Sequence, residues 1–132
     1  MNILLVDDSP EVRRCVRRLI ERQTTFTVVA EAGGGEEALE MLSALRPQVV
    51  VTDVNMPGID GVALTREIKR LYPSIQVLAL SSCIDFDTRE RMREAGASGY
   101  IVKGDERDVL TYELEALDQT RGQSRRTSST TS

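Results

Sequence analysis

The chain alternates five times between a strand-like segment and a helix-like segment, and few folds accept that order. Short apolar runs typical of buried strands occupy residues 2–7, 27–32, 48–53, 75–81 and 98–102. Apolar residues at helical spacing predict helices over 10–23, 36–45, 61–71, 87–95 and 106–118. Short connections between such segments give parallel strands with right-handed crossovers. We therefore expect an α/β fold with a doubly wound, five-stranded parallel sheet and helices on both faces.

Residue types near the helix boundaries support this assignment. Ser9 before Pro10 is a typical start for the first helix, and Asp60 is expected to cap the third. In the first helix, Cys15 falls among the apolar positions, so we expect it to be a small core residue. In the fifth helix, either Val109 or Leu110 is expected to face the core. With only two cysteines, no disulfide framework is expected, and a reducing, cytoplasmic setting fits best.

The length of 132 residues is enough for one core and too short for two. We expect one domain over residues 1–119 and a flexible Ser/Thr/Arg-rich tail or linker over 120–132, which has little to bury. Residues 1–120 hold 14 of the 17 basic residues and all 21 acidic ones. This negative balance argues against broad, nonspecific nucleic-acid binding by the folded body, and we expect no direct nucleic-acid contact by this domain. The chain has no apolar run long enough to span a membrane, so no membrane contact is expected.

Three carboxylates stand at the downstream ends of apolar runs. Asp7 and Asp8 close the first run, and Asp53 closes the third. In open parallel sheets, ligands bind beyond the carboxyl ends of the strands, where the strand order reverses. If the two strands are neighbours, three negative charges meet there, and such an arrangement is costly unless a cation lies between them. A divalent metal beside a free carboxylate points to phosphoryl chemistry.

Two more strand ends offer polar groups, Ser81 and Lys103. Asp53, alone at the end of a central strand, is the expected nucleophile for an acyl phosphate. Asp8, with Asp7 beside it, is the expected Mg²⁺ ligand, because Mg²⁺ prefers one or two carboxylates together with water and phosphate oxygens. Lys103 would neutralise phosphoryl oxygens, and Ser81 would donate a hydrogen bond to one of them.

Four motifs in the expected order closely resemble the receiver domain of bacterial two-component response regulators. They are Val-Asp-Asp at 6–8, Thr-Asp-Val-Asn-Met-Pro-Gly-Ile-Asp-Gly at 52–61, Leu-Ser-Ser at 80–82 and Gly-Tyr-Ile-Val-Lys at 99–103. Residues 31–39 and 103–105 look most like receivers of the LuxR/NarL type. The resemblance covers about residues 1–118 and implies a flavodoxin-like sheet with strand order 2-1-3-4-5.

The resemblance also implies a role for each residue of these motifs. Asp53 would accept a phosphoryl group from a sensor histidine kinase or a histidine phosphotransfer protein, with Asp7 and Asp8 forming an acidic Mg²⁺ pocket. The main-chain carbonyl of Asn55 would be a further metal ligand. Ser81 and Tyr100 would be a switch pair, the hydroxyl moving to the phosphoryl group while the ring turns inward. Lys103 would contact the phosphoryl oxygens. A homodimer and a role in transcription regulation are further expectations from the resemblance.

Two regions prompt additional expectations. Lys103 is followed by Gly104, where many receivers have a proline preceded by a cis peptide bond. A cis bond before any other residue costs about 2.5–4 kcal/mol, so the sequence leaves the geometry of the Lys103–Gly104 bond open. The fourth helix has few apolar anchors, chiefly Phe86, Met92 and Ala95. Weakly anchored elements are those that move, so phosphorylation is expected to shift residues 82–95.

Two other functions remain open from the sequence. A phosphotransferase of the haloacid-dehalogenase kind also uses an aspartyl phosphate with Mg²⁺. Those enzymes carry an Asp-x-Asp motif that begins at the nucleophile, whereas this chain has Asn55 in place of the second aspartate. A receiver-shaped binding module that no longer depends on phosphate is the third possibility, and the intact set of acids, serine and lysine argues against it. The expectation is a signalling module rather than an enzyme with turnover. No helix-turn-helix segment follows the domain, so the chain is either a stand-alone receiver or ends in a linker.

Overall fold

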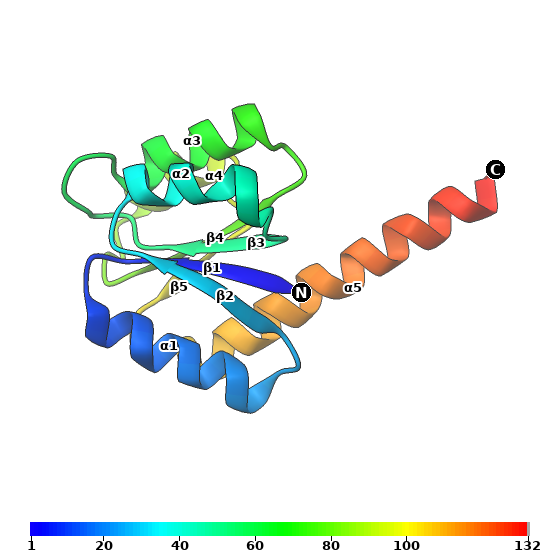
Figure 1. The fold of residues 1–132 in the computed structure, drawn as a ribbon, viewed down its shortest axis with the longest axis horizontal. Helices are drawn as coiled ribbons and strands as arrows, with labels where there is room; N and C mark the ends of the chain where they lie inside the picture. Colours follow the sequence, from blue (N-terminus) through cyan, green and yellow to red (C-terminus); the bar gives the residue numbers. More distant parts are fainter. Residues whose placement is uncertain (132) are drawn as a thin grey trace.

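The computed structural model describes the backbone of residues 1–131 and the side chains of residues 1–119. Five strands and five helices alternate along the chain (Figure 1). The strands are β1 (Asn2–Val6), β2 (Thr27–Ala32), β3 (Val49–Thr52), β4 (Gln76–Ser81) and β5 (Gly99–Val102). The helices are α1 (Pro10–Gln23), α2 (Gly35–Leu45), α3 (Gly61–Leu71), α4 (Phe86–Ala95) and α5 (Glu106–Thr131). The strand boundaries expected from the sequence are correct to within one residue.

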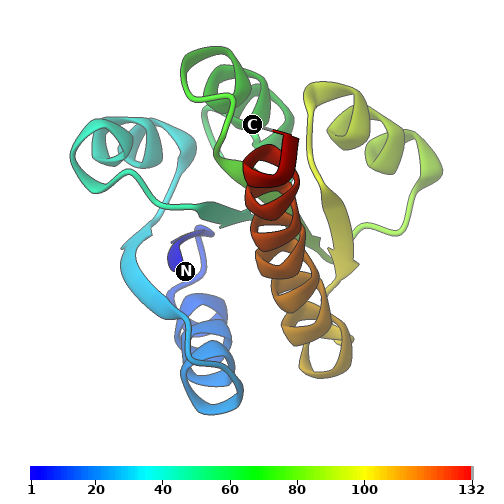
Figure 2. The ribbon, with the colours of Figure 1, turned by 90° about the vertical axis from the view of Figure 1, so that its right-hand side faces the viewer.

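The strands form one parallel sheet in the order β2-β1-β3-β4-β5. Helices α1 and α5 cover one face, and α2, α3 and α4 cover the other (Figures 1 and 2). The chain thus winds in both directions from β1, and the order reverses between β1 and β3. This confirms the expected doubly wound architecture and places the switch point at the strands that carry the three acids.

The core has a layer on each side of the sheet, because successive residues of each strand point to opposite faces. On the α1/α5 side, Ile3 and Leu5 of β1 pack with helical residues; those buried from the helices are Val16, Ile20, Leu110 and Leu114. On the other side, Leu4 and Val6 of β1 pack with residues of α2 and α3; those are Ala38, Leu42, Leu64 and Ile68. A smaller cluster holds α4 through Met92 and Ala95. Of the two candidates in α5, Leu110 is the fully buried one.

Two helix caps agree with the sequence. The Ser9 hydroxyl accepts a hydrogen bond from the Val12 N–H at 3.3 Å, and the Asp60 carboxylate accepts one from the Ala63 N–H at 2.9 Å. Both caps satisfy main-chain donors that the first turn of a helix leaves free. They fix where the two helices begin: α1 soon after Asp7 and Asp8, and α3 after the loop that follows Asp53.

Two expected core residues are exposed. Cys15 is a solvent-exposed free thiol, so its assignment to the core is wrong. Its position lies at the edge of the apolar stripe of α1, whose centre is formed by Val16 and Ile20. Phe86 was expected to anchor α4 but is 70% exposed, because α4 begins at Phe86 and Met92 lies about a third of a turn away around the helix.

Helix α5 is longer than expected. It was predicted to end at residue 118, but it continues to Thr131, and no proline interrupts the chain there. The residues assigned to a flexible tail therefore continue this helix up to 131, and residue 132 lies outside the described residues. Figure 1 shows the last turns of α5 extending away from the sheet. The domain boundary after residue 119 stays a prediction. Among the described residues, no helix combines the length and apolar character needed to cross a bilayer.

Candidate functional site

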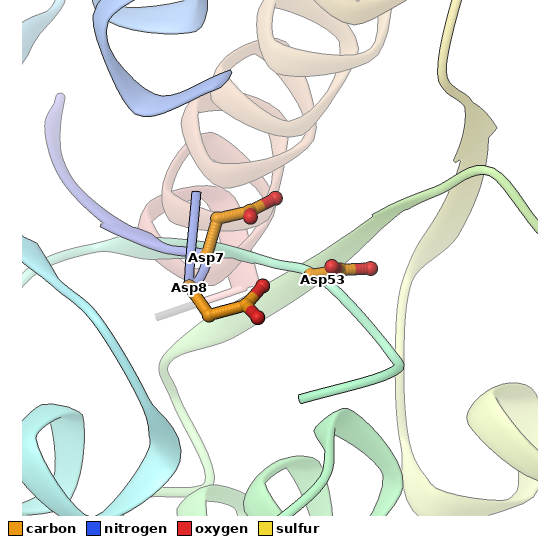
Figure 3. A group of neighbouring side chains, drawn as sticks. All are labelled: Asp7, Asp8 and Asp53. Atoms are coloured by element: carbon orange, nitrogen blue, oxygen red, sulfur yellow. The ribbon is translucent and has the colours of Figure 1, made fainter. Parts of the chain in front are cut away.

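Three carboxylates meet at the carboxyl end of the sheet. Asp7 and Asp8 follow β1 and Asp53 follows β3, and the two strands pair with Val6 opposite Thr52. One carboxylate oxygen from each acid lies within 4.8 Å of those of the other two. Figure 3 shows the three side chains next to one another with their carboxylates turned to the same side. Asp7 and Asp53 are 5% and 7% exposed, whereas Asp8 is open to solvent.

Lys103 joins this group from the end of β5. Its ammonium lies 3.0 Å from the Asp7 carboxylate and 3.2 Å from the Asp53 carboxylate. Burial tends to lower the pKa of Lys103, but the hydrogen bond to Asp7 and the charges of Asp53 and Asp7 outweigh it and raise the pKa. The ammonium therefore stays charged. The next residue, Gly104, has φ 108°, and no described peptide bond is cis. A glycine accepts this backbone angle without strain, so the chain turns after Lys103 in the way its sequence permits.

The main chain around Asp53 is held on several sides. Its N–H donates to the Val6 carbonyl at 2.9 Å, and its carbonyl accepts from the Thr52 hydroxyl at 2.8 Å. Its carboxylate accepts from the Val54 N–H at 2.7 Å. Gly61, the first residue of α3, approaches so closely that a Cβ atom there would lie 2.3 Å from the Asp53 carbonyl oxygen. These contacts fix the direction in which the Asp53 carboxylate points.

The electrostatics of Asp53 suit a reactive carboxylate. Burial is the main reason that its pKa lies above the usual value for aspartate. The charge of Lys103 opposes this shift, while the charge of Asp7 adds to it. The ionised form of Asp53 is thus poorly solvated and close to another negative charge, so a cation or an electrophilic phosphoryl group would relieve it.

Ser81 and Tyr100 form a separate pair beside the acids. Ser81 ends β4, is fully buried, and its hydroxyl accepts from the Cys83 N–H at 3.1 Å. The Tyr100 hydroxyl donates to the Cys83 carbonyl at 2.7 Å, and the Arg89 guanidinium lies 5.3 Å from the centre of the Tyr100 ring. Burial raises the pKa of the Tyr100 hydroxyl, and a hydrogen bond with Ser81 acts in the opposite direction. The expected switch residues are therefore neighbours, and both contact the chain that leads into α4.

The remaining sequence-predicted residue, Asn55, lies in the loop two positions after Asp53. Its side chain is exposed, unlike that of Asp53. No hydrogen bond or ion pair of this side chain is found among the described residues. The loop therefore leaves the Asn55 amide free toward solvent next to the acids.

The three acids fit a hard divalent cation. They offer only oxygen ligands, which Mg²⁺ and Ca²⁺ prefer, and two of the carboxylates are buried enough to be costly without a counter-charge. Lys103 supplies one positive charge to Asp7 and Asp53 but has no contact with Asp8 among the described side chains. Asp8 is the acid of the three that is open to solvent.

Sequence reasoning missed two residues that shape the site through main-chain contacts. Gly61 packs against the Asp53 carbonyl, as described above. Arg13 of α1 donates a hydrogen bond to the main-chain carbonyl of Asp7. Gly61 ends the motif at 52–61, but the motif alone does not show which backbone atom the glycine approaches. The contact of Arg13 leaves no pattern in the sequence, since its partner is a backbone atom that every residue has.

Comparison with known proteins decides the family. Residues 3–115 match the model of the response regulator receiver domain. The chain belongs to this family. It is 39% identical over 104 residues to the response regulator GacA of Pseudomonas viridiflava, covering 79% of this chain and 49% of GacA. This receiver thus spans about half the length of the curated relatives it matches.

Solved structures agree with the fold. A LuxR-family two-component response regulator from Aurantimonas sp. SI85-9A1 superposes with a TM-score of 0.84 at 37% identity, covering 88% of this receiver and 83% of that chain. The isolated REC domain of RcsB from Salmonella enterica serovar Typhimurium, solved with the phosphomimetic BeF₃⁻, gives a TM-score of 0.84 at 28% identity, covering 90% and 88%. The expected resemblance to LuxR/NarL-type receivers is confirmed.

Proposed function

We propose that Asp53 of this receiver accepts a phosphoryl group from a sensor histidine kinase or a histidine phosphotransfer protein, in a Mg²⁺-dependent reaction. The observation that carries the proposal is the position of the Asp53 carboxylate, which shares a cluster with Asp7 and Asp8 and lies 3.2 Å from the Lys103 ammonium. Nucleophile, metal ligands and a fixed positive charge are the groups that phosphoryl transfer requires from a protein.

The chemistry follows from these positions. An Asp53 carboxylate oxygen attacks the phosphorus atom, a P–O bond forms, and the P–N bond to the donor imidazole breaks with its electron pair passing to the imidazole. Mg²⁺ held by Asp8, Asp53, Asp7 and the Asn55 carbonyl would neutralise charge on the phosphoryl oxygens. The Lys103 ammonium stands close enough to Asp53 to contact a phosphoryl oxygen there. The hydrogen bond from Val54 keeps the carboxylate from rotating.

The readout we propose passes through Ser81 and Tyr100. When the Ser81 hydroxyl turns to a phosphoryl oxygen on Asp53, the Cys83 N–H loses its acceptor. Because the Tyr100 hydroxyl is bonded to the Cys83 carbonyl, both switch residues act on the same short segment before α4. This common contact supports a relay from the acids to the surface of α4 and β5.

The wider role is inferred from relatives. The relative from Brevibacillus brevis is a transcriptional regulatory protein, and a Salmonella RcsB structure contains promoter DNA. We propose that this receiver likewise controls transcription in the cytoplasm as part of a regulator, with DNA contacted outside residues 1–119, and that it forms a homodimer.

Acetyl phosphate tests the central claim. With Mg²⁺, the wild-type chain should gain one labile phosphoryl group, measured by intact-protein mass spectrometry, and excess EDTA should prevent it. Asp53→Asn should abolish the adduct. Asp60→Asn is the matched control, because it makes the same change in the same loop and asparagine still caps α3; it should be phosphorylated normally.

Two results would contradict the proposal. An adduct that survives Asp53→Asn would place the acceptor elsewhere, and a wild-type chain that forms no adduct would favour a phosphate-independent binding module. Multiple turnover of phosphate esters would instead support a phosphotransferase of the haloacid-dehalogenase kind.

A further inference from the structure

Arg13 reaches from α1 back to the end of β1. One guanidinium nitrogen donates to the main-chain carbonyl of Asp7, and Nε donates to the Glu31 carboxylate at 3.0 Å. The Arg13 side chain is only 18% exposed, so it is fixed by packing as well as by these bonds. It therefore connects Asp7, which follows β1, with Glu31 of β2.

Glu31 is itself held in place. Its second carboxylate oxygen accepts from Arg17 at 2.8 Å, and Arg17 also donates to the Val28 carbonyl at 3.3 Å. The hydrogen bond from Arg17 is the main reason that the pKa of Glu31 lies below its usual value, and Arg13 adds to the shift against the effect of burial. Glu31 thus remains ionised and gives Arg13 a fixed anchor on β2.

The carbonyl that Arg13 binds belongs to the peptide link between Asp7 and Asp8. The Asp7 N–H donates to the Ala32 carbonyl at 3.1 Å, and the Asp7 carboxylate accepts from the Ser9 N–H at 2.9 Å. Asp7 is therefore held by its own bonds. The described residues give the Asp8 side chain no hydrogen bond or ion pair, so its position depends on the plane of the peptide link before it.

We propose that Arg13, oriented by Glu31, is a positioning residue that presents Asp7 and Asp8 to the metal. This inference rests on the proposed function, since it concerns the Mg²⁺ ligands of that same site. Fixed supporting groups raise metal affinity because the ligands lose less freedom on binding.

The sign of the effect separates positioning from charge. A guanidinium near a cation site repels the cation, so a role through charge alone predicts tighter Mg²⁺ binding when Arg13 is removed. A positioning role predicts weaker binding. It also predicts weaker binding for Arg13→Lys, which keeps the charge but loses the planar fork that bonds Glu31 and the carbonyl together.

The test is a MgCl₂ titration of the purified chain followed by ¹H–¹⁵N NMR. Arg13→Gln and Arg13→Lys should each weaken Mg²⁺ binding by roughly 10–100-fold, the range typical of groups that orient metal ligands. Glu31→Gln should weaken it in the same direction, and should add little when combined with Arg13→Gln, because it acts through Arg13. Arg14→Gln is the matched control: the same charge change at an exposed neighbour on the same helix, with an expected change below about twofold.

Each outcome bears on a different claim. A wild-type chain that does not bind Mg²⁺, or binds it equally well after Asp8→Asn, overturns both the proposed function and this inference. Normal wild-type binding with unchanged or tighter binding in both Arg13 variants overturns this inference alone. So does a drop in thermal stability measured in EDTA with no change in Mg²⁺ affinity, the result of a purely structural role. If Arg13→Gln does not fold, Arg13→Lys and Glu31→Gln decide the question.

Discussion

The acidic rim, formed by Asp7, Asp8, Asp53 and Lys103, lies next to the segment 82–95, which includes α4. The rim is held firmly, whereas the segment is held weakly. On the rim, Asp7 and Asp53 are almost fully buried and share the Lys103 ammonium, and main-chain contacts hold Asp53 on several sides. In the segment 82–95, Ile84 and Phe86 are 78% and 70% exposed.

The start of α4 shows the same contrast. Asp85 stands at its N-cap, but among the described residues its carboxylate accepts only from the Thr88 hydroxyl, at 3.3 Å, and from no main-chain N–H of the first turn, unlike Ser9 of α1 and Asp60 of α3. The segment is anchored chiefly by Met92, by Ala95 and by the Tyr100 hydroxyl. Chemistry at the acids requires side chains that are already fixed in the reactive geometry. A relay instead requires a segment that can adopt two conformations of similar free energy. In the proposed function, this receiver would meet the two requirements with two different regions of the sheet edge.

The largest effect is expected from one methyl group added next to Asp53, which tests whether the rim is packed more tightly than other parts of the molecule. Gly61→Ala would place a Cβ atom 2.3 Å from the Asp53 carbonyl oxygen and 2.7 Å from the Val54 Cα. Because both neighbours are backbone, we expect a loss of about 3 kcal/mol in the free energy of unfolding, measured with urea. Gly33→Ala, whose Cβ would meet only side-chain atoms at 3.7 Å, should change it by less than about 0.5 kcal/mol. Equal losses in the two variants would show that the rim is no more tightly built than a surface loop.

The second prediction concerns the weakly anchored segment 82–95. With beryllofluoride and Mg²⁺, amide hydrogen exchange in residues 82–95 should change by roughly tenfold, within the usual range of coupling between sites. Exchange in β1 and β3 should stay as it was. The Asp53→Asn variant, which lacks the carboxylate that would hold beryllofluoride, serves as the control and should show neither change. Unchanged exchange in 82–95 of the wild type would contradict the relay.

The smallest expected effect tests the single hydroxyl that joins the two regions. Tyr100→Phe removes the hydrogen bond to the Cys83 carbonyl, which is worth about 1 kcal/mol. Without beryllofluoride, amide exchange in residues 82–95 should therefore be about fivefold faster than in the wild type. Tyr112→Phe is the same change at a 70% exposed residue of α5 and should leave exchange as in the wild type. If both variants exchange like the wild type, the hydroxyl does not hold the segment.

The fold could be predicted from the sequence because its signals are local. Apolar runs and caps such as Ser9 and Asp60 mark the elements. The alternation of strands and helices then favours a parallel sheet with helices on both faces. The errors occurred where coverage by other elements decides burial. Cys15 and Phe86 are apolar and lie in helices, but only packing determines which side of α1 or α4 is covered. The end of α5 was missed because polar helix formers and loop residues overlap in composition.

The residues of the candidate site also fall into those that could be predicted from the sequence and those that could not. Asp7, Asp8, Asp53 and Lys103 were placed together because strand ends in a parallel sheet share one edge, and the structure brings their charged groups within reach of one another. Arg13 and Gly61 were missed. Their partners are main-chain carbonyl oxygens, which every residue carries, so the sequence does not show which carbonyl each of them contacts.

The glycine at the start of α3 has a consequence for the path of a signal. No atom separates Gly61 from the Asp53 carbonyl, and the Gly61 N–H also donates to the Val54 carbonyl at 2.7 Å. The end of β3 and the first turn of α3 must therefore shift as one body. Helix α4 meets α3 through side chains, as in the 4.0 Å contact of the Met92 sulfur with the Thr65 hydroxyl. Side chains can change rotamer and slide, so we expect a displacement that begins at Asp53 to carry the start of α3 with it and to reach α4 through contacts that can rearrange.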